Sequence, residues 1–227
     1  MGKDWSKAAP LTGVLFAVLA ASGAVTEGST PSATASGSTV TAFYVAHQHR
    51  QQLAAVLLAF AFIVLVCFAA TLRAQLRRPN GRDSLATLAL IGAAVLAVGQ
   101  TTTAGCSWAL AADPGKLTTA TAQTLNLAGN DLVLTSAAGW FIFNVAAGLA
   151  IFATKALPRW LAWASILIGV VAVTPAEFVA FLALVIWSLV TAALLWRRNP
   201  PPATTEPTLP TQSPSARQSA DAAGTAT

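Results

Sequence analysis

Long apolar stretches without charged residues alternate with short polar segments along most of the chain. Six stretches contain no Asp, Glu, Lys, Arg or His. Most of them approach the length of about 20 apolar residues that a helix needs to cross a bilayer. They are Leu11–Thr26, Gln52–Leu72, Ser84–Ala104, Leu132–Thr154, Trp160–Thr174 and Phe178–Trp196. Because a helix satisfies its own backbone in lipid, the pattern predicts an all-α fold, a polytopic transmembrane bundle of six spans.

The chain divides into a membrane part and a tail. Residues 1–198 hold all six stretches and are expected to form one transmembrane helical domain. Residues 199–227 are rich in Pro, Thr, Ser and Ala and contain almost no large apolar residue. Such a composition cannot bury enough apolar surface to fold, so we expect a disordered cytoplasmic tail.

Three connections on the predicted outer side carry distinct signals. Glu27–Thr41 is rich in Ser, Thr and Gly, which indicates a flexible loop. Residues 117–131 mix polar and apolar positions and predict an amphipathic helix along the outer surface. Joined to the fourth span this helix would run about 55 Å, so we expect a break near Gly129. Thr174–Ala176 contains a proline and predicts a tight external link between the last two spans.

The composition supports a membrane location. Hydrophobic residues make up 55% of the chain and charged residues only 9%, whereas soluble domains average about 25% charged. The net charge is +5, but the basic residues flank apolar segments. Anionic lipid headgroups at the inner face are therefore the expected partner, and nucleic acid is not. Arginine outnumbers lysine nine to four, which together with abundant alanine indicates a high-GC bacterial genome. The expected location is therefore the bacterial plasma membrane.

The basic residues also predict the orientation of the chain. With a cytoplasmic amino terminus, eleven of the 13 lie inside, and only Arg50 and Lys116 lie outside. The inner set is Lys3, Lys7, Arg73, Arg77, Arg78, Arg82, Lys155, Arg159, Arg197, Arg198 and Arg217. The positive-inside rule therefore predicts that both termini are cytoplasmic.

The first stretch has two interpretations. It forms a short span, or it is a secretory signal in which Lys3 and Lys7 precede an apolar run and the small residues 22–24 mark a cleavage site. Cleavage would leave five spans in the same orientation.

Small residues recur at every fourth position of the third span: Ala89, Ala93, Ala97, Thr101 and Gly105. This spacing lets membrane helices approach closely. We expect the face to pack within the chain, and the alternative is a homo-oligomer formed through it.

Polar residues at helical spacing suggest a small cavity open to the outside. The third span contributes one such face, the fourth span another, and Trp187 of the sixth span reaches a similar depth. The predicted cavity-lining residues are Gln100, Thr103, Ser107, Ser136, Trp140, Asn144 and Trp187. The alternative is that these side chains only form hydrogen bonds between helices, each contributing about 0.6 kcal/mol.

A second polar group is expected around the outer ends of the helices. This predicted external polar rim contains His47, Arg50, Gln51, Asp113, Asp131 and Glu177. His47 and His49 would point about 200° apart on a helix, and no Cys or acidic residue follows at ligand spacing, so no metal site is expected. Cys67 and Cys106 differ in predicted depth by about 20 Å, so they should not form a disulfide.

Two short motifs resemble those of a known family. Phe43-Tyr44 followed by His47, and the run Leu157–Leu161 with sequence LPRWL, are similar to motifs of small uncharacterised bacterial multi-pass membrane proteins, a family with a domain of unknown function. The resemblance implies an all-helical membrane fold over residues 11–198 and supplies no catalytic residues.

We therefore expect a membrane protein without catalytic activity or cofactor, an accessory or small-molecule-binding component of the bacterial cell envelope. One alternative is a transporter that carries a small neutral solute past Gln100 and Asn144. Ion coupling is disfavoured because no ionisable residue lies within a span. A second alternative is a membrane enzyme using His47, Asp131 and Glu177, although no nucleophile and base occur at recognisable spacing.

Overall fold

Most of the chain that the structure describes is helical. The computed structural model describes residues 10–76, 84–174 and 176–198, and within these ranges it contains no strand. The elements are α2 (Leu11–Glu27), α3 (Gly37–Gln75), α4 (Ser84–Ala112), the short 3-10 helix η1 (Pro114–Lys116), α5 (Thr119–Asp131), α6 (Val133–Thr154), α7 (Arg159–Val171) and α8 (Glu177–Arg198). The all-α prediction is confirmed. The predicted disordered tail lies outside the described residues.

Four helices are long and apolar enough to cross a membrane. They are α3, α4, α8, and α5 and α6 taken together. The two shorter apolar helices are α2, with 17 residues, and α7, with 13 residues. At 1.5 Å per residue α7 is about 20 Å long, less than the roughly 30 Å thickness of the hydrocarbon core. These lengths and compositions are those of a membrane protein.

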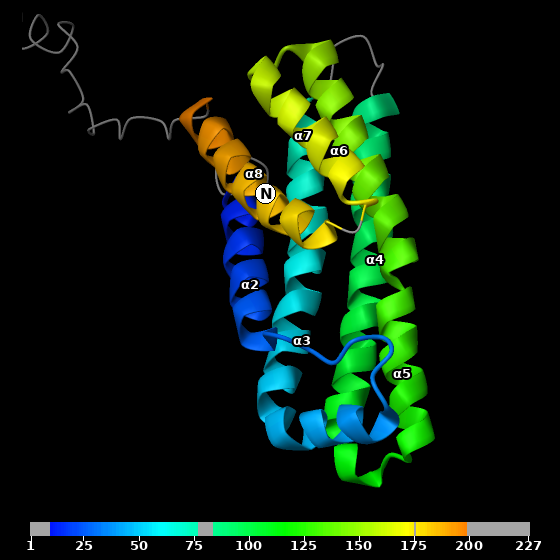
Figure 1. The fold of residues 1–227 in the computed structure, drawn as a ribbon. Helices are drawn as coiled ribbons and strands as arrows, with labels where there is room; N and C mark the ends of the chain where they lie inside the picture. Colours follow the sequence, from blue (N-terminus) through cyan, green and yellow to red (C-terminus); the bar gives the residue numbers. More distant parts are fainter. Residues whose placement is uncertain (1–9, 77–83, 175, 199–227) are drawn as a thin grey trace, which may run out of the picture.

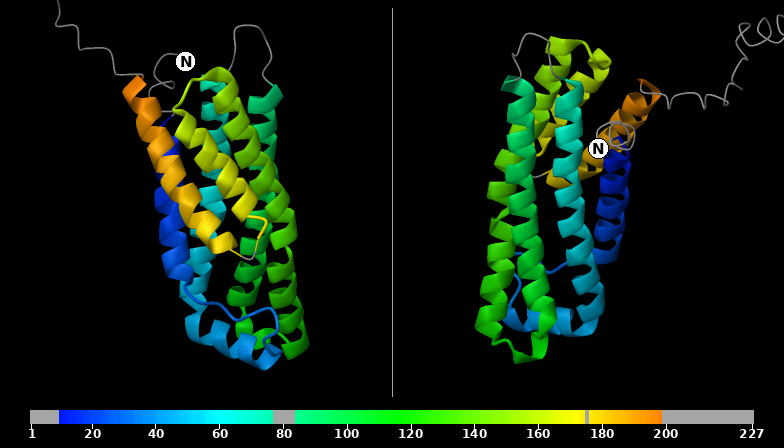
Figure 2. Two further views of the ribbon diagram at one scale, coloured as in Figure 1. Left: turned by 45° about the horizontal axis from the view of Figure 1, so that its top comes forward. Right: turned by 180° about the vertical axis from the view of Figure 1, so that it is seen from behind.

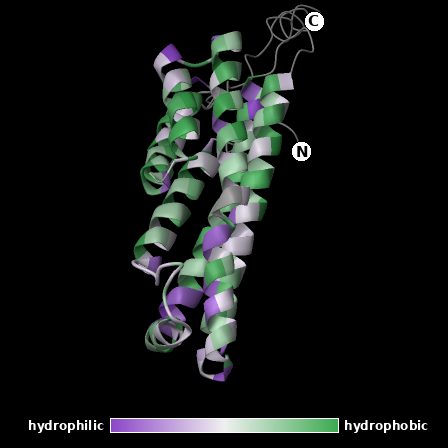
Figure 3. Cartoon of the chain, turned by 45° about the vertical axis from the view of Figure 1, so that its right-hand side comes forward, coloured by the Kyte–Doolittle hydropathy of each residue, from purple (hydrophilic) through white to green (hydrophobic). Residues whose placement is uncertain are grey.

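The helices form an elongated bundle with two different ends (Figure 1 and Figure 2). The ends of α3, α6 and α8 and the start of α7 meet at what we call the basic end, which carries Arg73, Lys155, Arg159, Arg197 and Arg198. The opposite end is the cap, formed by residues 28–51 and 105–131, where Arg50 and Lys116 lie. Apolar residues dominate the long helices, and several hydrophilic residues gather in the cap (Figure 3).

Helices α4 and α6 pack with their backbones in close approach. A Cβ added to Gly92 of α4 would lie 2.4 Å from the backbone nitrogen of Phe143, and one added to Gly139 of α6 would lie 2.3 Å from that of Leu96. Only glycine permits such a contact, which is how membrane helices commonly pack.

The small-residue face of α4 is used largely within the chain. Ala89, Ala93 and Ala97 are buried in the bundle. Thr101 is only half-buried, and a Cβ on Gly105 would meet no heavy atom of the described residues within 4 Å. Packing within the chain therefore accounts for the first three positions, and a homo-oligomer through the remaining two stays a prediction.

The molecule contains two separate apolar cores. The larger runs through the bundle and includes Phe16, Phe62, Trp140 and Trp187. The smaller lies in the cap and consists of Val40, Tyr44, Leu110, Ala111 and Ala122. The start of α3, the end of α4 and α5 supply its residues, so the cap is an ordered helical layer and not only a set of loops.

A kink at His47 turns the start of α3 across the cap (Figure 1). His47 has φ −123° and ψ 22°, which interrupts the helix. Its Nδ1 lies 2.9 Å from the carbonyl oxygen of Phe43, and the two rings are 4.7 Å apart. The imidazole thus lies against the backbone of the preceding helical turn, next to the kink.

The predicted outer helix differs from expectation in direction. The expected break is present at the single residue Leu132, three residues after Gly129. Beyond it α5 continues in line with α6 and stands beside the end of α4 (Figure 1), instead of lying along the outer surface. The reason is apolar packing: Ala122 and Leu125 of α5 contact the cap core, which contains Leu110 of α4.

The link between α7 and α8 also differs from the prediction. We expected an external turn at Thr174–Ala176. The turn instead lies beside the middle of α3 and α4 (Figure 1 and Figure 2). Helix α7 ends at Val171 after 13 residues and is too short to reach the cap. The two helices therefore form a hairpin that starts and ends near the basic end and penetrates only part of the bundle.

Candidate functional site

A cavity of about 290 Å³ opens beside the tip of the α7–α8 hairpin. We call it the main cavity. Its lining comes from five helices and comprises Ala24, Glu27, Gly28, Leu58, Phe62, Gln100, Trp140, Glu177, Phe178 and Phe181. Ligand pockets range from about 300 to 1,000 Å³, so this volume suits a small molecule.

The main cavity reaches about half-way along the bundle. Phe62 lies ten residues after Gln52 on α3, which corresponds to about 15 Å of helix. Leu58 of α3 and Gln100 of α4, each near the middle of its helix, line the cavity as well. The cavity exists at this depth because the α7–α8 hairpin stops short and brings Glu177 and Phe178 to the middle of the molecule.

Aromatic rings fill the bundle between the main cavity and the basic end. Phe62 packs edge-on against Trp140 at a centroid distance of 6.5 Å and against Phe16 at 6.0 Å. Farther along, Trp187 packs edge-on against Phe143 at 6.2 Å and Phe68 at 6.3 Å. All six rings are at most 3% exposed. Edge-to-face contacts of this kind favour a rigid, close-packed aromatic layer below the main cavity.

Trp140 carries a buried donor without a partner. Its side chain is 1% exposed and lines the main cavity, yet the indole Nε1 has no hydrogen-bond acceptor among the described residues. Trp187, in contrast, donates from Nε1 to the Leu161 carbonyl oxygen at 3.1 Å. A buried polar group without a partner costs about 1–3 kcal/mol, so Nε1 is an unsatisfied donor on a side chain that lines the cavity.

A second, smaller cavity of about 140 Å³ lies in the cap. Thr103 and Ser107 of α4 line it together with Tyr44, Asn126 and Asn130. Asn126 of α5 donates from Nδ2 to the Ser32 carbonyl oxygen at 2.8 Å. This bond attaches the loop that joins α2 and α3 to helix α5. Glu27 lines both cavities and therefore lies between them.

The predicted cavity residues separate into three places. Gln100 and Trp140 line the main cavity, and Thr103 and Ser107 line the cap cavity. Ser136, Asn144 and Trp187 are buried and line neither. The backbone oxygen of Asn144 accepts a bond from Ser165 Oγ at 2.7 Å, and its Nδ2 donates to the Trp140 carbonyl at 3.0 Å, so Asn144 links α6 to α7.

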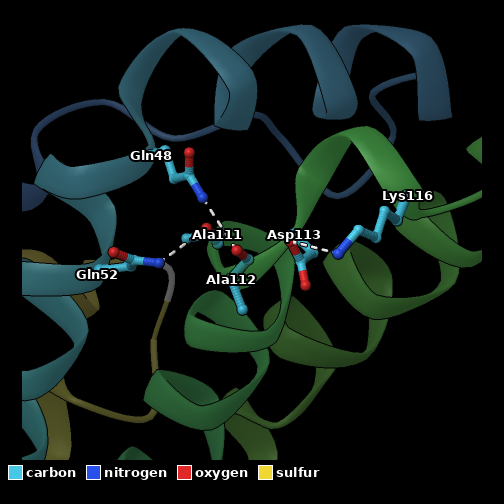
Figure 4. Close-up of polar contacts among 6 residues, drawn as sticks. All are labelled: Gln48, Gln52, Ala111, Ala112, Asp113 and Lys116. Carbon is cyan, nitrogen blue, oxygen red and sulfur yellow. Dashed lines mark hydrogen bonds and ion pairs between the residues drawn. The ribbon is translucent and has the colours of Figure 1, made fainter.

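The polar residues at the bend of α3 hold the ends of two other helices. Gln48 and Gln52 donate from Nε2 to the carbonyl oxygens of Ala112 and Ala111, at 2.9 and 3.1 Å, where α4 ends (Figure 4). The last carbonyls of a helix have no partner within the helix. These two glutamines supply the missing donors to α4.

The neighbouring residues do the same for α2. Gln51 donates from Nε2 to the Glu27 carbonyl oxygen at 2.8 Å, and Arg50 donates from Nε to the Thr26 carbonyl oxygen. Gly28 adopts φ +62° at this helix end, where an added Cβ would collide with the Arg50 guanidinium. Arg50 and Gln51 of the predicted external rim thus cap α2, and the cation also suits the negative end of the helix dipole.

The remaining rim residues do not gather at one site. Asp113 forms an exposed ion pair with Lys116 at 3.2 Å (Figure 4), and Asp131 is exposed at the end of α5. Of His47, Asp131 and Glu177, the residues of the enzyme alternative, only Glu177 lines either cavity.

Two carboxyl groups of the main cavity lack a cation. Within the described ranges neither Glu27 nor Glu177 forms an ion pair. Glu27 follows the first apolar stretch, and burial raises the pKa of its carboxyl group because the charged form loses hydration. It also ends α2, where the helix dipole disfavours a negative charge.

Sequence reasoning missed Glu27, Phe62, Phe178 and Phe181. One signal was present: an acidic residue stands directly after the first apolar stretch and another directly before the last. These two acidic residues line one cavity because of where the α7–α8 turn lies, and the sequence pattern did not predict that position.

No family model, no curated protein and no solved structure matches this chain.

Proposed function

We propose that this multi-pass membrane protein binds a small molecule in the main cavity and has no catalytic activity. The observation that carries this proposal is a cavity of about 290 Å³ that is lined by Gln100, two carboxyl groups and Trp140, whose buried Nε1 has no partner among the described residues. Apolar walls with a few convergent polar groups are typical of ligand sites. The proposed role is that of a binding or accessory component of the bacterial cell envelope.

We also propose the orientation in the plasma membrane. The basic end would face the cytoplasm, where it meets anionic headgroups, and the cap would face outward. Among the described residues five basic side chains lie at the basic end and two in the cap, which supports this orientation. The α7–α8 hairpin would enter and leave the bundle on the cytoplasmic side, so that both termini stay inside.

Cysteine labelling tests the orientation. Lys116→Cys in the cap and Arg159→Cys at the basic end, both at exposed positions, are introduced separately after Cys67 and Cys106 are replaced by Ala. A membrane-impermeant maleimide should label position 116 in intact cells and position 159 only after permeabilisation. The reverse pattern would refute the proposed orientation.

A cavity-filling substitution tests the binding function. Ala24 lines the main cavity, whereas Ala21 on the same helix is exposed. We expect compounds that raise the melting temperature of the purified protein to lose their effect in Ala24→Leu and to keep it in Ala21→Leu. If both variants respond like the wild type, the ligand does not bind in the main cavity.

Transport of a small neutral solute is the second candidate, favoured by the cavity's position half-way through the bundle. The packed rings of Phe62, Trp140 and Trp187 would have to move to open a path to the basic end. Solute uptake by protein reconstituted in vesicles separates the two functions, because a binding component retains ligand without accumulating it.

A further inference from the structure

We propose that the main cavity selects an organic ammonium ion that also carries an apolar group and an oxygen acceptor. The inference rests on the proposed small-molecule binding at this cavity and names the chemistry of the ligand. Glu27 and Glu177 would balance the positive charge, aromatic rings would hold the apolar group, and Trp140 would bind the oxygen.

The two carboxyl groups of the main cavity are the reason to expect a positively charged ligand. Glu27 ends α2 and Glu177 begins α8, so residues far apart in sequence bring two negative groups to one cavity. The dipole of α8 favours Glu177, but burial and the dipole of α2 both disfavour an ionised Glu27. Both side chains are partly buried, and a charge that is partly buried without a partner is destabilising. A ligand cation between the two groups would offset the cost of burying the negative charges and the unfavourable dipole of α2.

The neighbouring protein cation does not fill this role. Arg50 lies close to the end of α2, but its Nε donates to the Thr26 carbonyl oxygen and its guanidinium lies against Gly28. Within the described ranges no ion pair joins Arg50 to Glu27 or Glu177. The negative groups of the cavity are therefore left for a ligand.

The aromatic lining suits the rest of an ammonium ligand. Phe62, Trp140, Phe178 and Phe181 all line the main cavity. The faces of such rings attract ammonium groups, and this attraction strengthens where water is excluded. An ammonium group has no acceptor, however, and the Nε1 of Trp140 is an unpartnered donor. The ligand should therefore add a hydroxyl or carbonyl oxygen to its ammonium group.

Three matched compounds test the two requirements in the wild-type protein. Phenylethanolamine carries the ammonium and the hydroxyl, phenylethanediol replaces the ammonium by a neutral hydroxyl, and phenethylamine lacks the hydroxyl. In lipid-free detergent at neutral pH, we expect calorimetry to give the tightest binding for phenylethanolamine and about tenfold or greater weakening for the diol. A smaller loss is expected for phenethylamine.

Amide variants then assign the charge to the two residues. Glu27→Gln and Glu177→Gln keep the side-chain shape and should each weaken phenylethanolamine binding about tenfold, while diol binding stays unchanged. Asp131→Asn is the control, because Asp131 is exposed and lines neither cavity, and it should bind like the wild type. The comparison of compounds in the wild type needs no variant and stands even if one of these variants fails to fold.

A lipid headgroup offers the same ammonium chemistry as a free amine. Nanodiscs of phosphatidylglycerol, with or without phosphatidylethanolamine, distinguish the two sources. If the headgroup is the ligand, phosphatidylethanolamine should raise the melting temperature of the wild type and reduce phenylethanolamine binding, and Glu177→Gln should abolish both effects. If a free amine is the ligand, both nanodiscs should give the same binding.

The outcomes separate this inference from the proposed function. Equal binding of phenylethanolamine and phenylethanediol overturns the charge selection but leaves small-molecule binding in place. Binding that Asp131→Asn weakens as much as Glu177→Gln also overturns the assignment. If compounds of every charge class fail to bind, and Ala24→Leu changes nothing, both proposals are wrong.

Discussion

The bundle and the cap are stabilised in different ways. The bundle core contains thirty buried residues and packs through glycine contacts such as Gly92 with α6. The cap core contains five buried residues, and side-chain amides bonded to helix ends supplement it, as with Gln48, Gln52 and Asn126. Within lipid, helices associate by close packing because burial from water offers no gain. The cap therefore depends more on individual hydrogen bonds than the bundle does.

The largest effect should follow from breaking the close packing of the bundle. Gly139→Leu would place its side chain against the backbone of Leu96, which cannot move aside as a flexible side chain would. Overpacking costs about 1–3 kcal/mol and occasionally more, and we expect the upper end here. Gly105→Ala, in open space on α4, is the control and should leave the melting temperature the same or slightly higher. Equal stability of the two variants would contradict the packing.

A smaller and local effect should follow from removing hydrogen bonds in the cap. The double variant Gln48→Ala, Gln52→Ala leaves the Ala111 and Ala112 carbonyls without these donors, at a cost of about 1–2 kcal/mol. Hydrogen exchange should speed up in the cap and stay unchanged in the bundle. Gln123→Ala changes an exposed glutamine of α5 and should affect neither region. Uniformly faster exchange would mean that cap and bundle unfold together.

The smallest effect concerns Glu27, which lies where the two regions meet. Because its folded-state pKa is raised, its contribution to stability is fully present below the unfolded pKa and is lost as pH rises through the folded pKa. Glu27→Gln cannot ionise, so without ligand it should match the wild type at acidic pH and exceed its melting temperature above neutral pH. The neighbouring groups Tyr44, Cys106 and Glu177 are unchanged in this variant.

Asp131→Asn again serves as the matched control for this pH series. Its carboxyl group is exposed, so its replacement should not change the pH dependence of the melting temperature. A wild-type curve that is parallel to that of Glu27→Gln at every pH would contradict the raised pKa.

The sequence pattern predicted the bundle better than the cap. Hydropathy identifies α3, α4, α6 and α8 because their apolar runs are long. It cannot predict the kink at His47 or the direction of α5, since both depend on contacts with the end of α4. In the cap, the predicted loop Glu27–Thr41 is shorter than expected, because α3 already begins at Gly37.

The candidate site was predictable only in part. Gln100 and Trp140 were expected to line a cavity because of their helical spacing, and both line the main cavity. The sequence predicts Glu177 on an external rim, but the cavity that it lines is shared with Leu58, Phe62 and Gln100. The reason is that α7 has only 13 residues, about 20 Å, and cannot carry the chain the length of the bundle.

The run of donors on α3 has a mechanical consequence. Gln48 and Gln52 hold the end of α4, while Arg50 and Gln51 hold the end of α2. A single helical turn thus ties two helices that lie on different sides of α3. A shift of either helix along its axis would break its hydrogen bonds to this turn of α3. The turn therefore fixes the axial positions of α2 and α4 relative to each other.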